Sequence, residues 1–497
     1  VLILLHVSNL FLYRSWGVLI NYRALTFLAD WRQMFLSVNN VELVGGIIFI
    51  ILLFLLAWFV FRKTTKHFFD NKLSIIQALL PFIVTAIMTV IMFRGGVQML
   101  PVNESAAAFS ENVTLNHIAT NPAWHLGHNL NQAKSENAAF YKFYGDEVAE
   151  EHVKKLFQTP VDLMPVLNNK KPNIVIIMLE SFTADVVGAM GGEAGISPTI
   201  DSLIHDGLSF KNIYSSGART DQAFVAVLSG FPAQPNQSIM RFPDKTAKLP
   251  SLPAELKKQG YNTSFYYGGD LDFSNLNTYL VNCGFEHITG KKKFKQQQLS
   301  AKWGAHDEFV FEKNLNDLKQ SKEPFFSVVM TLSSHEPYDI PMKTPFGKAN
   351  ANEQFKGSAW YADHSLGNYL AAAKKEPWFK NTLFVVVADH GNKIPRDRSY
   401  YSHYIRHIPM VMAGDVVKNI YKNKIVYSTG SHHDIASTLL HQLGLNADMF
   451  NWSNDLLNRK RNGFAYLCMD DAEGWVTDSC TFVYDLSNKK FIYKRPY

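Results

Sequence analysis

Cysteine is scarce in this sequence, with three residues in a chain of 497. So few cysteines exclude a small scaffold held together by disulfides. Charged residues are also fewer than usual, at 19% compared with about 25% in soluble domains. The chain has no internal repeat and no low-complexity tract, and 47% of it is hydrophobic, which excludes an intrinsically disordered protein. We therefore expect part of the chain to avoid water.

The positive charge is modest, with a formal net charge of +6. No dense cluster of lysine and arginine is present, so we predict no nucleic-acid partner. The length exceeds the roughly 250–300 residues at which a single hydrophobic core stops growing. We expect a membrane part followed by one large α/β domain. The chain begins with Val1 in an apolar stretch, and we expect further membrane spans to precede it.

Two uncharged apolar runs, residues 43–61 and 73–93, have the length of membrane-spanning helices. The second run contains Pro81, which membrane helices tolerate. Residues 1–20 are apolar but interrupted by a histidine and an arginine. This first stretch is either a third span or a segment lying at the membrane surface.

The loop between the two runs carries Arg62, Lys63, Lys66 and Lys72, opposed by Asp70 alone. Short loops rich in lysine and arginine stay in the cytoplasm. The second span then runs outward, so that everything after it lies outside. The sequence therefore predicts a multi-pass protein of the cytoplasmic (inner) membrane, with its large domain on the extracytoplasmic or periplasmic side.

Strand-like and helix-like segments alternate in the second half of the chain. Short apolar runs rich in β-branched residues predict buried parallel strands at 174–180, 263–269, 325–332, 382–391 and 408–414. Helical patterns occur at 198–207, 251–260 and 432–444, and each ends in a glycine that would cap it, Gly207, Gly260 and Gly444. This alternation predicts an α/β domain with a doubly wound, mostly parallel sheet.

The composition changes along the chain predict four regions. Residues 1–94 form the transmembrane region, with at least two spans, and 95–170 form a membrane-proximal linker with helices. Residues 171–445 form the α/β domain, and 446–497 form a C-terminal subdomain with a small antiparallel sheet. Cys468 and Cys480 flank a possible hairpin there, and the sequence leaves open whether they form a disulfide or stay free.

Two of the predicted strands end in ionisable residues. Glu180 follows one strand, and Asp389 and His390 follow another. Ligands bind beyond the carboxyl ends of strands in open α/β sheets, so these side chains are expected to converge. Two carboxylates and one imidazole suit a divalent cation such as Mn²⁺, Mg²⁺ or Zn²⁺. An acidic residue at a strand end, taken alone, is more often a helix cap or a loop residue.

A third segment, residues 215–224, reads SSGARTDQAF and places Thr220 at the start of a helix. Open backbone N–H groups at a helix N-terminus stabilise an anion, and a metal-bound hydroxyl can act as a nucleophile. The alternative is that Thr220 is an ordinary helix cap. Arg219 can neutralise a phosphate or pair with the neighbouring Asp221.

These segments occur in a specific order: NIVIIMLESF, SSGARTDQAFVAVLSGFP, TLSSHEPY, ADHGN and HHDIASTLLHQLG. Together with GGDLDFSN and WGAHDE, they resemble the lipoteichoic acid synthase family of phosphoglycerol transferases, within the sulfatase/alkaline phosphatase superfamily. RGGVQ at 94–98 and NP at 121–122 resemble its Gram-negative-type members. The resemblance runs from the second span to about residue 445 and implies a sulfatase-like catalytic domain at 171–445.

The resemblance implies roles for particular residues. The expected metal ligands are Glu180, Thr220, Asp389 and His390, with Mn²⁺ preferred over Mg²⁺ or Zn²⁺ and Thr220 as nucleophile. His335 is expected to contact the substrate phosphate or transfer a proton. Further substrate-binding residues are Asp270, Trp303 and Arg219. The segments around Asp270 and Trp303 depart from the Gram-positive pattern, which weakens their transfer from the family.

The implied reaction moves sn-glycerol phosphate from phosphatidylglycerol, in the outer leaflet, to a glycan or polyglycerol-phosphate acceptor through a phosphothreonine-type intermediate. Sulfatases proper carry a modified Cys or Ser in place of Thr220, which argues against sulfate hydrolysis. Alternatives are a phosphoethanolamine transferase, a phosphodiesterase or sulfatase-like hydrolase, and a membrane-anchored binding protein with an inactive site. His403 and His407 are expected near the crevice, and His432 and His433 at a solvent-exposed or capping helix start.

Overall fold

The structure is a computed structural model that describes residues 2–16, 19–20, 40–65, 74–98, 100–110, 113–136, 143–157, 160–235, 238–469, 472–486 and 488–496. The chain divides into two compact units, Val1–Phe140 and Tyr141–Tyr497, each of which is described by itself. The N-terminal unit is helical, and the C-terminal unit contains every strand that the structure describes.

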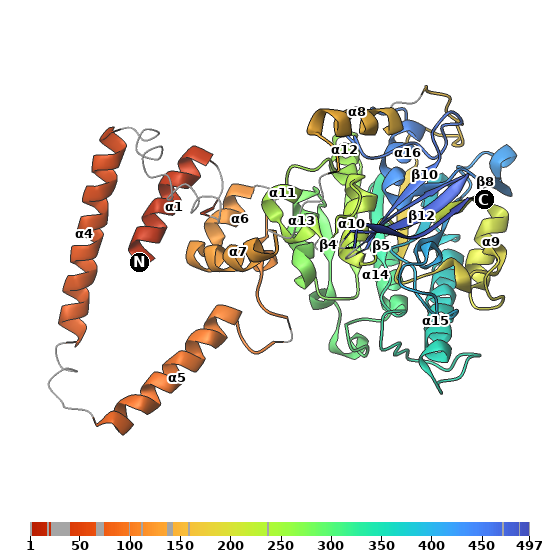
Figure 1. Cartoon of the computed structure of the whole chain (residues 1–497). Coiled ribbons are helices and arrows are strands. Elements are labelled where there is room, and N and C mark those ends of the chain that lie inside the picture. Colours follow the sequence, from red (N-terminus) through yellow and green to blue (C-terminus); the bar gives the residue numbers. More distant parts are fainter. Residues whose placement is uncertain are drawn as a thin grey trace. The chain divides into compact units, whose positions relative to one another are not determined.

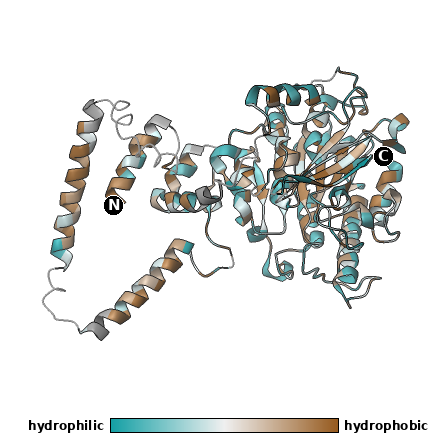
Figure 2. Cartoon of the chain, in the orientation of Figure 1, coloured by the Kyte–Doolittle hydropathy of each residue, from teal (hydrophilic) through white to brown (hydrophobic). Residues whose placement is uncertain are grey.

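Long apolar helices dominate the N-terminal unit. Its helices are α1 (Leu2–Trp16), α4 (Asn40–Thr65), α5 (Ile75–Arg94), η1 (Glu104–Ala107), α6 (Val113–Ala119) and α7 (Pro122–Glu136). Within the described residues one helix, Val44–Thr65 with 22 residues, is long and apolar enough to cross a membrane. Figure 2 shows the coloured parts of α4 and α5 as largely hydrophobic, each with a hydrophilic C-terminal end.

The first predicted span therefore corresponds to α4, whose apolar side chains are exposed along most of its length. The second run is also helical, as α5, but its described apolar stretch, Leu79–Arg94, is shorter than a bilayer crossing. A multi-pass topology stays a prediction. The basic loop that sets the predicted orientation lies outside the described residues from position 66 to 73.

The C-terminal unit alternates strands and helices (Figure 1). Its strands are β1 (Asn173–Leu179), β2 (Leu208–Tyr214), β3 (Asn262–Tyr267), β4 (His287–Thr289), β5 (Phe325–Met330), β6 (Thr382–Ala388), β7 (His407–Ala413), β8 (Lys424–Val426), β9 (Gly430–Ser431) and β10–β13. Its main helices are α8 (Asp146–Phe157), α9 (Pro198–Asp206), α10 (Thr220–Ser229), α11 (Pro243–Thr246), α12 (Leu252–Lys258), α13 (Leu276–Asn282), α14 (Asp307–Leu318), α15 (Ala351–Ala373) and α16 (Ile435–Gln442).

The main sheet has the strand order β4-β3-β5-β1-β6-β7-β2-β8, and β9 also pairs with β2. All neighbouring pairs are parallel except those of β7, which runs antiparallel to β6 and β2. The sheet is thus mixed but mostly parallel. The five strands predicted from sequence are β1, β3, β5, β6 and β7. Every residue of β1, β5 and β6 is buried, because helices cover both faces of the sheet.

Two helix groups enclose the sheet. Helices α9, α14 and α15 pack together, and α10, α12 and α16 form the second group (Figure 1). The start of α9 is capped from another helix, because both carboxylate oxygens of buried Asp363 on α15 accept hydrogen bonds from the backbone N–H groups of Thr199 and Ile200, each 2.9 Å long. This contact fixes α9 against α15.

The predicted glycine caps differ in conformation. Gly260 and Gly444 have positive φ values of 83° and 73°, the left-handed geometry expected after a helix. Gly207 also ends its helix, but its backbone is extended. A Cβ atom there would lie 2.6 Å from the Met412 carbonyl oxygen, so close strand packing explains this glycine instead.

The tail forms the predicted small antiparallel sheet, with the order β10 (Phe464–Cys468), β11 (Ala472–Thr477), β12 (Cys480–Asp485) and β13 (Lys490–Pro496). All three cysteines, each of them described, are free thiols. Cys468 lies on β10 and Cys480 on β12, with β11 between them. Two strand spacings of about 4.8 Å separate these strands, beyond the usual reach of a disulfide.

Candidate metal centre

The sheet register brings Glu180 and Asp389 to the same edge. Strands β1 and β6 are parallel neighbours, and Leu179 pairs with Ala388 at their carboxyl ends. Glu180 and Asp389 are the next residues of these strands, so they lie side by side although 209 positions separate them in sequence (389 − 180). A hydrogen bond of 3.0 Å from the Asp389 N–H group to the Leu179 carbonyl oxygen continues the ladder into the site.

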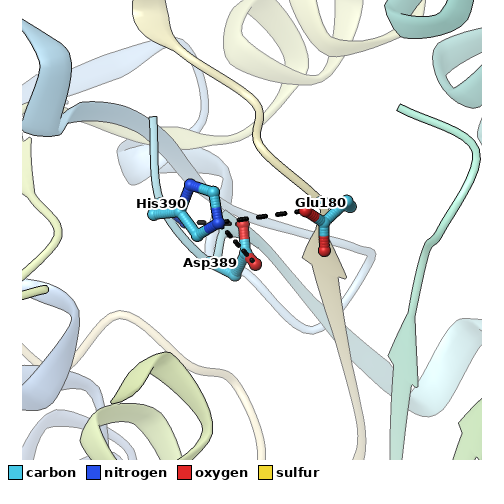
Figure 3. Close-up of side chains that lie close together, drawn as sticks. All are labelled: Glu180, Asp389 and His390. Carbon is cyan, nitrogen blue, oxygen red and sulfur yellow. Dashed lines mark hydrogen bonds and ion pairs between the residues drawn. The ribbon is translucent and has the colours of Figure 1, made fainter. Parts of the chain in front are cut away.

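Glu180, Asp389 and His390 form a compact cluster (Figure 3). One ligand atom from each lies within 4.8 Å of the other two. The His390 Nε2 atom is 3.8 Å from Glu180 Oε1 and 3.6 Å from Asp389 Oδ2. The predicted convergence of these three side chains is therefore present in the structure.

The two carboxylates are buried, with Glu180 1% and Asp389 0% exposed. Asp389 Oδ1 accepts hydrogen bonds from the N–H groups of Ser181 and His390, at 2.8 and 2.6 Å. Asp389 Oδ2 has no hydrogen-bond partner among the described residues. Burial, together with the nearby charge of Asp389, raises the pKa of Glu180. A bound cation would stabilise such a buried carboxylate pair. The oxygen donors of the pair and the nitrogen donor of His390 suit a divalent metal.

The imidazole of His390 has the orientation that a metal ligand requires. Its Nδ1–H group donates to the Gly391 carbonyl oxygen at 2.9 Å, which leaves the Nε2 lone pair facing the carboxylates. Gly391 is needed here because a Cβ atom would lie 1.9 Å from the Ile405 carbonyl oxygen.

His432 and His433 are both buried. The expectation that they face solvent at a helix start, or cap the helix there, is therefore wrong with respect to solvent exposure. They form the short 3₁₀ turn η11 (His432–Asp434) before α16. His432 Nε2–H donates to the Asp389 carbonyl oxygen at 3.0 Å. This hydrogen bond holds the backbone of Asp389 at the candidate metal centre. Burial lowers the pKa of His432 to about 3, so its ring is neutral. The sequence alone gave no signal for this contact.

Thr220 reaches the same edge from strand β2. Because β7 is antiparallel to both β6 and β2, the carboxyl end of β2 lies at the edge where β1 and β6 end. The following loop leads into α10, whose first residue is Thr220 and whose cap residue is Arg219. The Thr220 hydroxyl lies 3.3 Å from Glu180 Oε2. It therefore faces the cluster instead of capping the helix.

Asp221 pairs with a different arginine from the one considered in sequence. Its buried carboxylate lies 3.9 Å from the Arg241 Nε atom. Arg219 is half-buried at the start of α10, next to Thr220. Burial raises the pKa of Asp221, and the two arginines counteract this effect.

His335 and Trp303 lie together beside the end of β5. Their ring centroids are 5.2 Å apart in an edge-on arrangement. The Trp303 Nε1–H group donates to the Glu336 carbonyl oxygen at 2.7 Å, and His335 Nδ1–H donates to the same oxygen at 2.8 Å. His335 is half-buried.

Asp270 belongs to a neighbouring turn after β3. The Gly268 carbonyl oxygen accepts a 3.0 Å hydrogen bond from the Ala305 N–H group, which joins this turn to the Trp303 segment. Sequence reasoning did not single out Asp307, which ties the same segment to β5: its Oδ1 atom accepts hydrogen bonds from the N–H groups of Leu332 and Ser333, at 2.6 and 3.1 Å.

His403 and His407 lie on the segment that leads from the metal centre into β7. Both are largely buried, and burial lowers the pKa of each imidazole. His403 Nδ1 and N–H contact the Tyr493 hydroxyl of β13, and His407 Nε2–H donates to the Lys211 carbonyl oxygen at 2.8 Å. These contacts join both histidines to neighbouring strands.

Comparison with known proteins gives matches along most of the C-terminal unit. The sulfatase family model matches residues 172–445. A lipoteichoic acid synthase-like protein of Bacillus subtilis is 22% identical over 321 residues, which make up 60% of this chain and 52% of that protein. Phosphoglycerol transferase I of Citrobacter koseri is 24% identical over 215 residues, 39% of this chain and 28% of that protein. The chain thus spans about half or less of these relatives.

Solved structures share the fold. A protein of the alkaline phosphatase superfamily from Vibrio parahaemolyticus superposes with a TM-score of 0.62 and 25% identity, covering 72% of this chain and 92% of its own. The lipoteichoic acid synthase LtaP from Listeria monocytogenes gives a TM-score of 0.59 at 19% identity, covering 69% and 92%. Because the family model matches more than half of the sequence, this chain belongs to the sulfatase family, and within it the chain resembles the lipoteichoic acid synthase-like proteins.

Proposed function

We propose that this protein is a membrane-anchored, metal-dependent phosphoglycerol transferase. The observation that carries the proposal is the hydroxyl of Thr220, 3.3 Å from Glu180 and beside the cluster of Glu180, Asp389 and His390. A threonine at the start of a helix and next to a divalent-cation site is equipped for nucleophilic attack on phosphorus. The names of its relatives, phosphoglycerol transferase and lipoteichoic acid synthase, support this choice of reaction.

Glu180, Thr220, Asp389 and His390 are the residues proposed to hold the ion, with Mn²⁺ the first candidate and Mg²⁺ or Zn²⁺ the alternatives. A bound divalent ion would stabilise the threonine alkoxide and the negative charge on a phosphoryl oxygen. The protein itself contributes the fixed geometry. Ser181 donates its hydroxyl to Glu180 at 2.8 Å, and Ser334 donates to the Glu180 carbonyl oxygen at 2.6 Å.

The proposed reaction has two displacements. Thr220 Oγ1 attacks the phosphorus of a phosphatidylglycerol headgroup, the bond to the lipid oxygen breaks, and diacylglycerol leaves with the proton. The hydroxyl of an acceptor, a glycan or a glycerol phosphate polymer, then displaces the threonine oxygen. His335 Nε2 is proposed to accept or return a proton, and the hydrogen bond from its Nδ1–H group to the Glu336 carbonyl oxygen supports this role.

The substrate pocket is proposed to include Arg219, Asp270 and Trp303. Arg219 precedes the nucleophile and brings a positive charge to the phosphate. Trp303 forms one wall against His335, and the Asp270 turn is joined to the Trp303 segment through Gly268 and Ala305. A donor lipid in the outer leaflet suits an extracytoplasmic domain that is anchored by α4.

Release of diacylglycerol from fluorescent phosphatidylglycerol tests the proposal. The full chain is reconstituted in nanodiscs with Mn²⁺, and Thr220→Ala and a chelator serve as controls. We expect release that falls to background in both controls, while Thr220→Ser keeps measurable activity because it retains the hydroxyl. Turnover of phosphatidylethanolamine or of a sulfate ester in its place would contradict the headgroup assignment. Release that survives Thr220→Ala would contradict the nucleophile.

A further inference from the structure

A second cavity lies in the C-terminal unit, away from the metal centre. It has a volume of about 640 Å³ and is bordered by α8, α16 and the segment from Ala447 to Asn458. Sites for small organic ligands have volumes of roughly 300–1,000 Å³. His432, which precedes α16, contacts Asp389, whereas the cavity lining contains Ser437 and His441 of α16 and no residue of the candidate metal centre. The cavity is therefore a separate feature from the centre described above.

One wall of the cavity is aromatic and apolar. Trp452 is 38% exposed, and its ring is held by edge-on contacts with Phe157 and Phe231, at centroid distances of 6.0 and 6.3 Å. Val153 of α8 also lines this wall. A ring that is fixed by neighbours but still open to solvent offers a flat surface to a ligand at little cost in conformational entropy.

A buried side-chain amide adds a polar group to the cavity lining. Asn454 lines the cavity and is 5% exposed, and its Nδ2 group has no hydrogen-bond partner among the described residues. A buried donor without a partner is costly, so an oxygen atom of a ligand would relieve this cost. Asn451, which is exposed, and the hydroxyl of Ser437 add further polar groups to the lining.

The charged groups of the lining are already paired. Lys154 lies 2.8 Å from Glu150, and His441 Nδ1 lies 2.9 Å from Asp455 Oδ2. Asp448 accepts a 2.8 Å hydrogen bond from the side-chain amide of Asn446. The described lining therefore leaves no cation without an acidic partner, which disfavours a phosphate-bearing ligand. A flat apolar wall facing amide and carboxylate groups fits a ligand that has an apolar face and several hydroxyls.

We propose that this cavity binds a neutral sugar unit of an oligosaccharide. One face of the pyranose ring lies on Trp452, and a sugar oxygen accepts the hydrogen bond of Asn454 Nδ2. The carboxylate of Asp448 accepts a hydrogen bond from a sugar hydroxyl. This inference goes beyond the proposed transfer reaction, since sugar binding needs neither the metal centre nor Thr220. It adds a docking position for a glycan at a distance from the reacting atoms.

Binding of neutral glucose oligomers tests the inference. The full chain is placed in nanodiscs, because maltoside and glucoside detergents carry the sugars that the experiment measures. Maltohexaose, cellohexaose and laminarihexaose are titrated by calorimetry, and an oligomer of glycerol phosphate is the anionic comparison. The variants are Trp452→Ala and Asn454→Leu, with Tyr427→Ala as the matched control, since Tyr427 is 65% exposed and lies outside the cavity lining.

We expect saturable binding of at least one neutral hexasaccharide, weakened at least tenfold by Trp452→Ala and by Asn454→Leu. Affinity should be unchanged in Tyr427→Ala and in Thr220→Ala, so that a failure of the transfer reaction leaves this result intact. The loss of binding in Asn454→Leu, with a thermal transition that is not lowered, separates a lost contact from misfolding. Three results would overturn the inference: no binding of any neutral oligomer, binding that both cavity variants leave unchanged, or displacement of the sugar by glycerol phosphate.

Discussion

Asp307 allows a test of how a buried carboxylate beside the candidate site changes the free energy of unfolding with pH. Its side chain is fully buried at the start of α14. Oδ1 accepts two backbone hydrogen bonds from the β5 end, while Oδ2 has no partner among the described residues. Burial raises the pKa of Asp307 to about 6. Asp307→Asn keeps the accepting oxygen and removes only the charge.

The magnitude follows from the pKa difference. An unfolded aspartate has a pKa of about 3.9, and about two units of difference correspond to ~3 kcal/mol. The folded protein holds the proton more tightly, so this contribution to stability is present below the unfolded pKa and is lost as the pH rises through about 6. Allowing about 1 kcal/mol for the unpaired amide, Asp307→Asn should be more stable than the parent by about 2 kcal/mol at pH 8.

Pulse proteolysis in urea, with the full chain in nanodiscs, measures the free energy of unfolding at several pH values. The gain from Asp307→Asn should disappear at a pH of about 4.5. Asp307→Ala is the control for the lost acceptor, and it should be less stable than Asp307→Asn by about 2–4 kcal/mol at every pH. A gain that does not change with pH, or an Asp307→Asn protein that is less stable than the parent at pH 8, would refute the reasoning.

Two further substitutions and one labelling experiment have defined outcomes. Gly391→Ala should lower the thermal transition and abolish turnover, because its Cβ atom would lie 1.9 Å from the Ile405 carbonyl oxygen; normal activity would contradict this packing. Asp363→Ala should destabilise the start of α9 by about 2–3 kcal/mol, since two backbone N–H groups lose their acceptor, and faster amide exchange at Thr199 and Ile200 would report it. Maleimide labelling of the denatured, unreduced protein should find three free thiols, whereas one free thiol would indicate a disulfide.

Three residues of the candidate site were predictable because they directly follow predicted strands. Parallel strands expose their carboxyl ends at one edge, so Glu180, Asp389 and His390 followed from two apolar runs and the residues after them. The strand that leads to Thr220 was not predicted. This strand, β2, alternates polar with apolar residues and contains an irregular register near Phe210, so that its pattern did not stand out.

The contacts behind the site were not predictable from residue types. His432 lies in a turn whose sequence fits an exposed helix start, and only tertiary packing brings it to the Asp389 carbonyl oxygen. Asp307 looked like an ordinary acidic residue in the first turn of a helix, but it serves the backbone of another strand. The state of Cys468 and Cys480 was open in the sequence because it depends on which strands are neighbours. Such features depend on partners far away in sequence.

Trapping the proposed covalent intermediate on Thr220 tests the proposed transfer reaction most directly. The full chain in nanodiscs is mixed with phosphatidylglycerol and Mn²⁺, quenched in acid, digested, and analysed by mass spectrometry for the peptide that contains Thr220. We expect a glycerol phosphate adduct on Thr220 that is absent without the metal and in Thr220→Ala. An adduct on another residue, or steady release of diacylglycerol with Thr220 unmodified at every quench time, would contradict it.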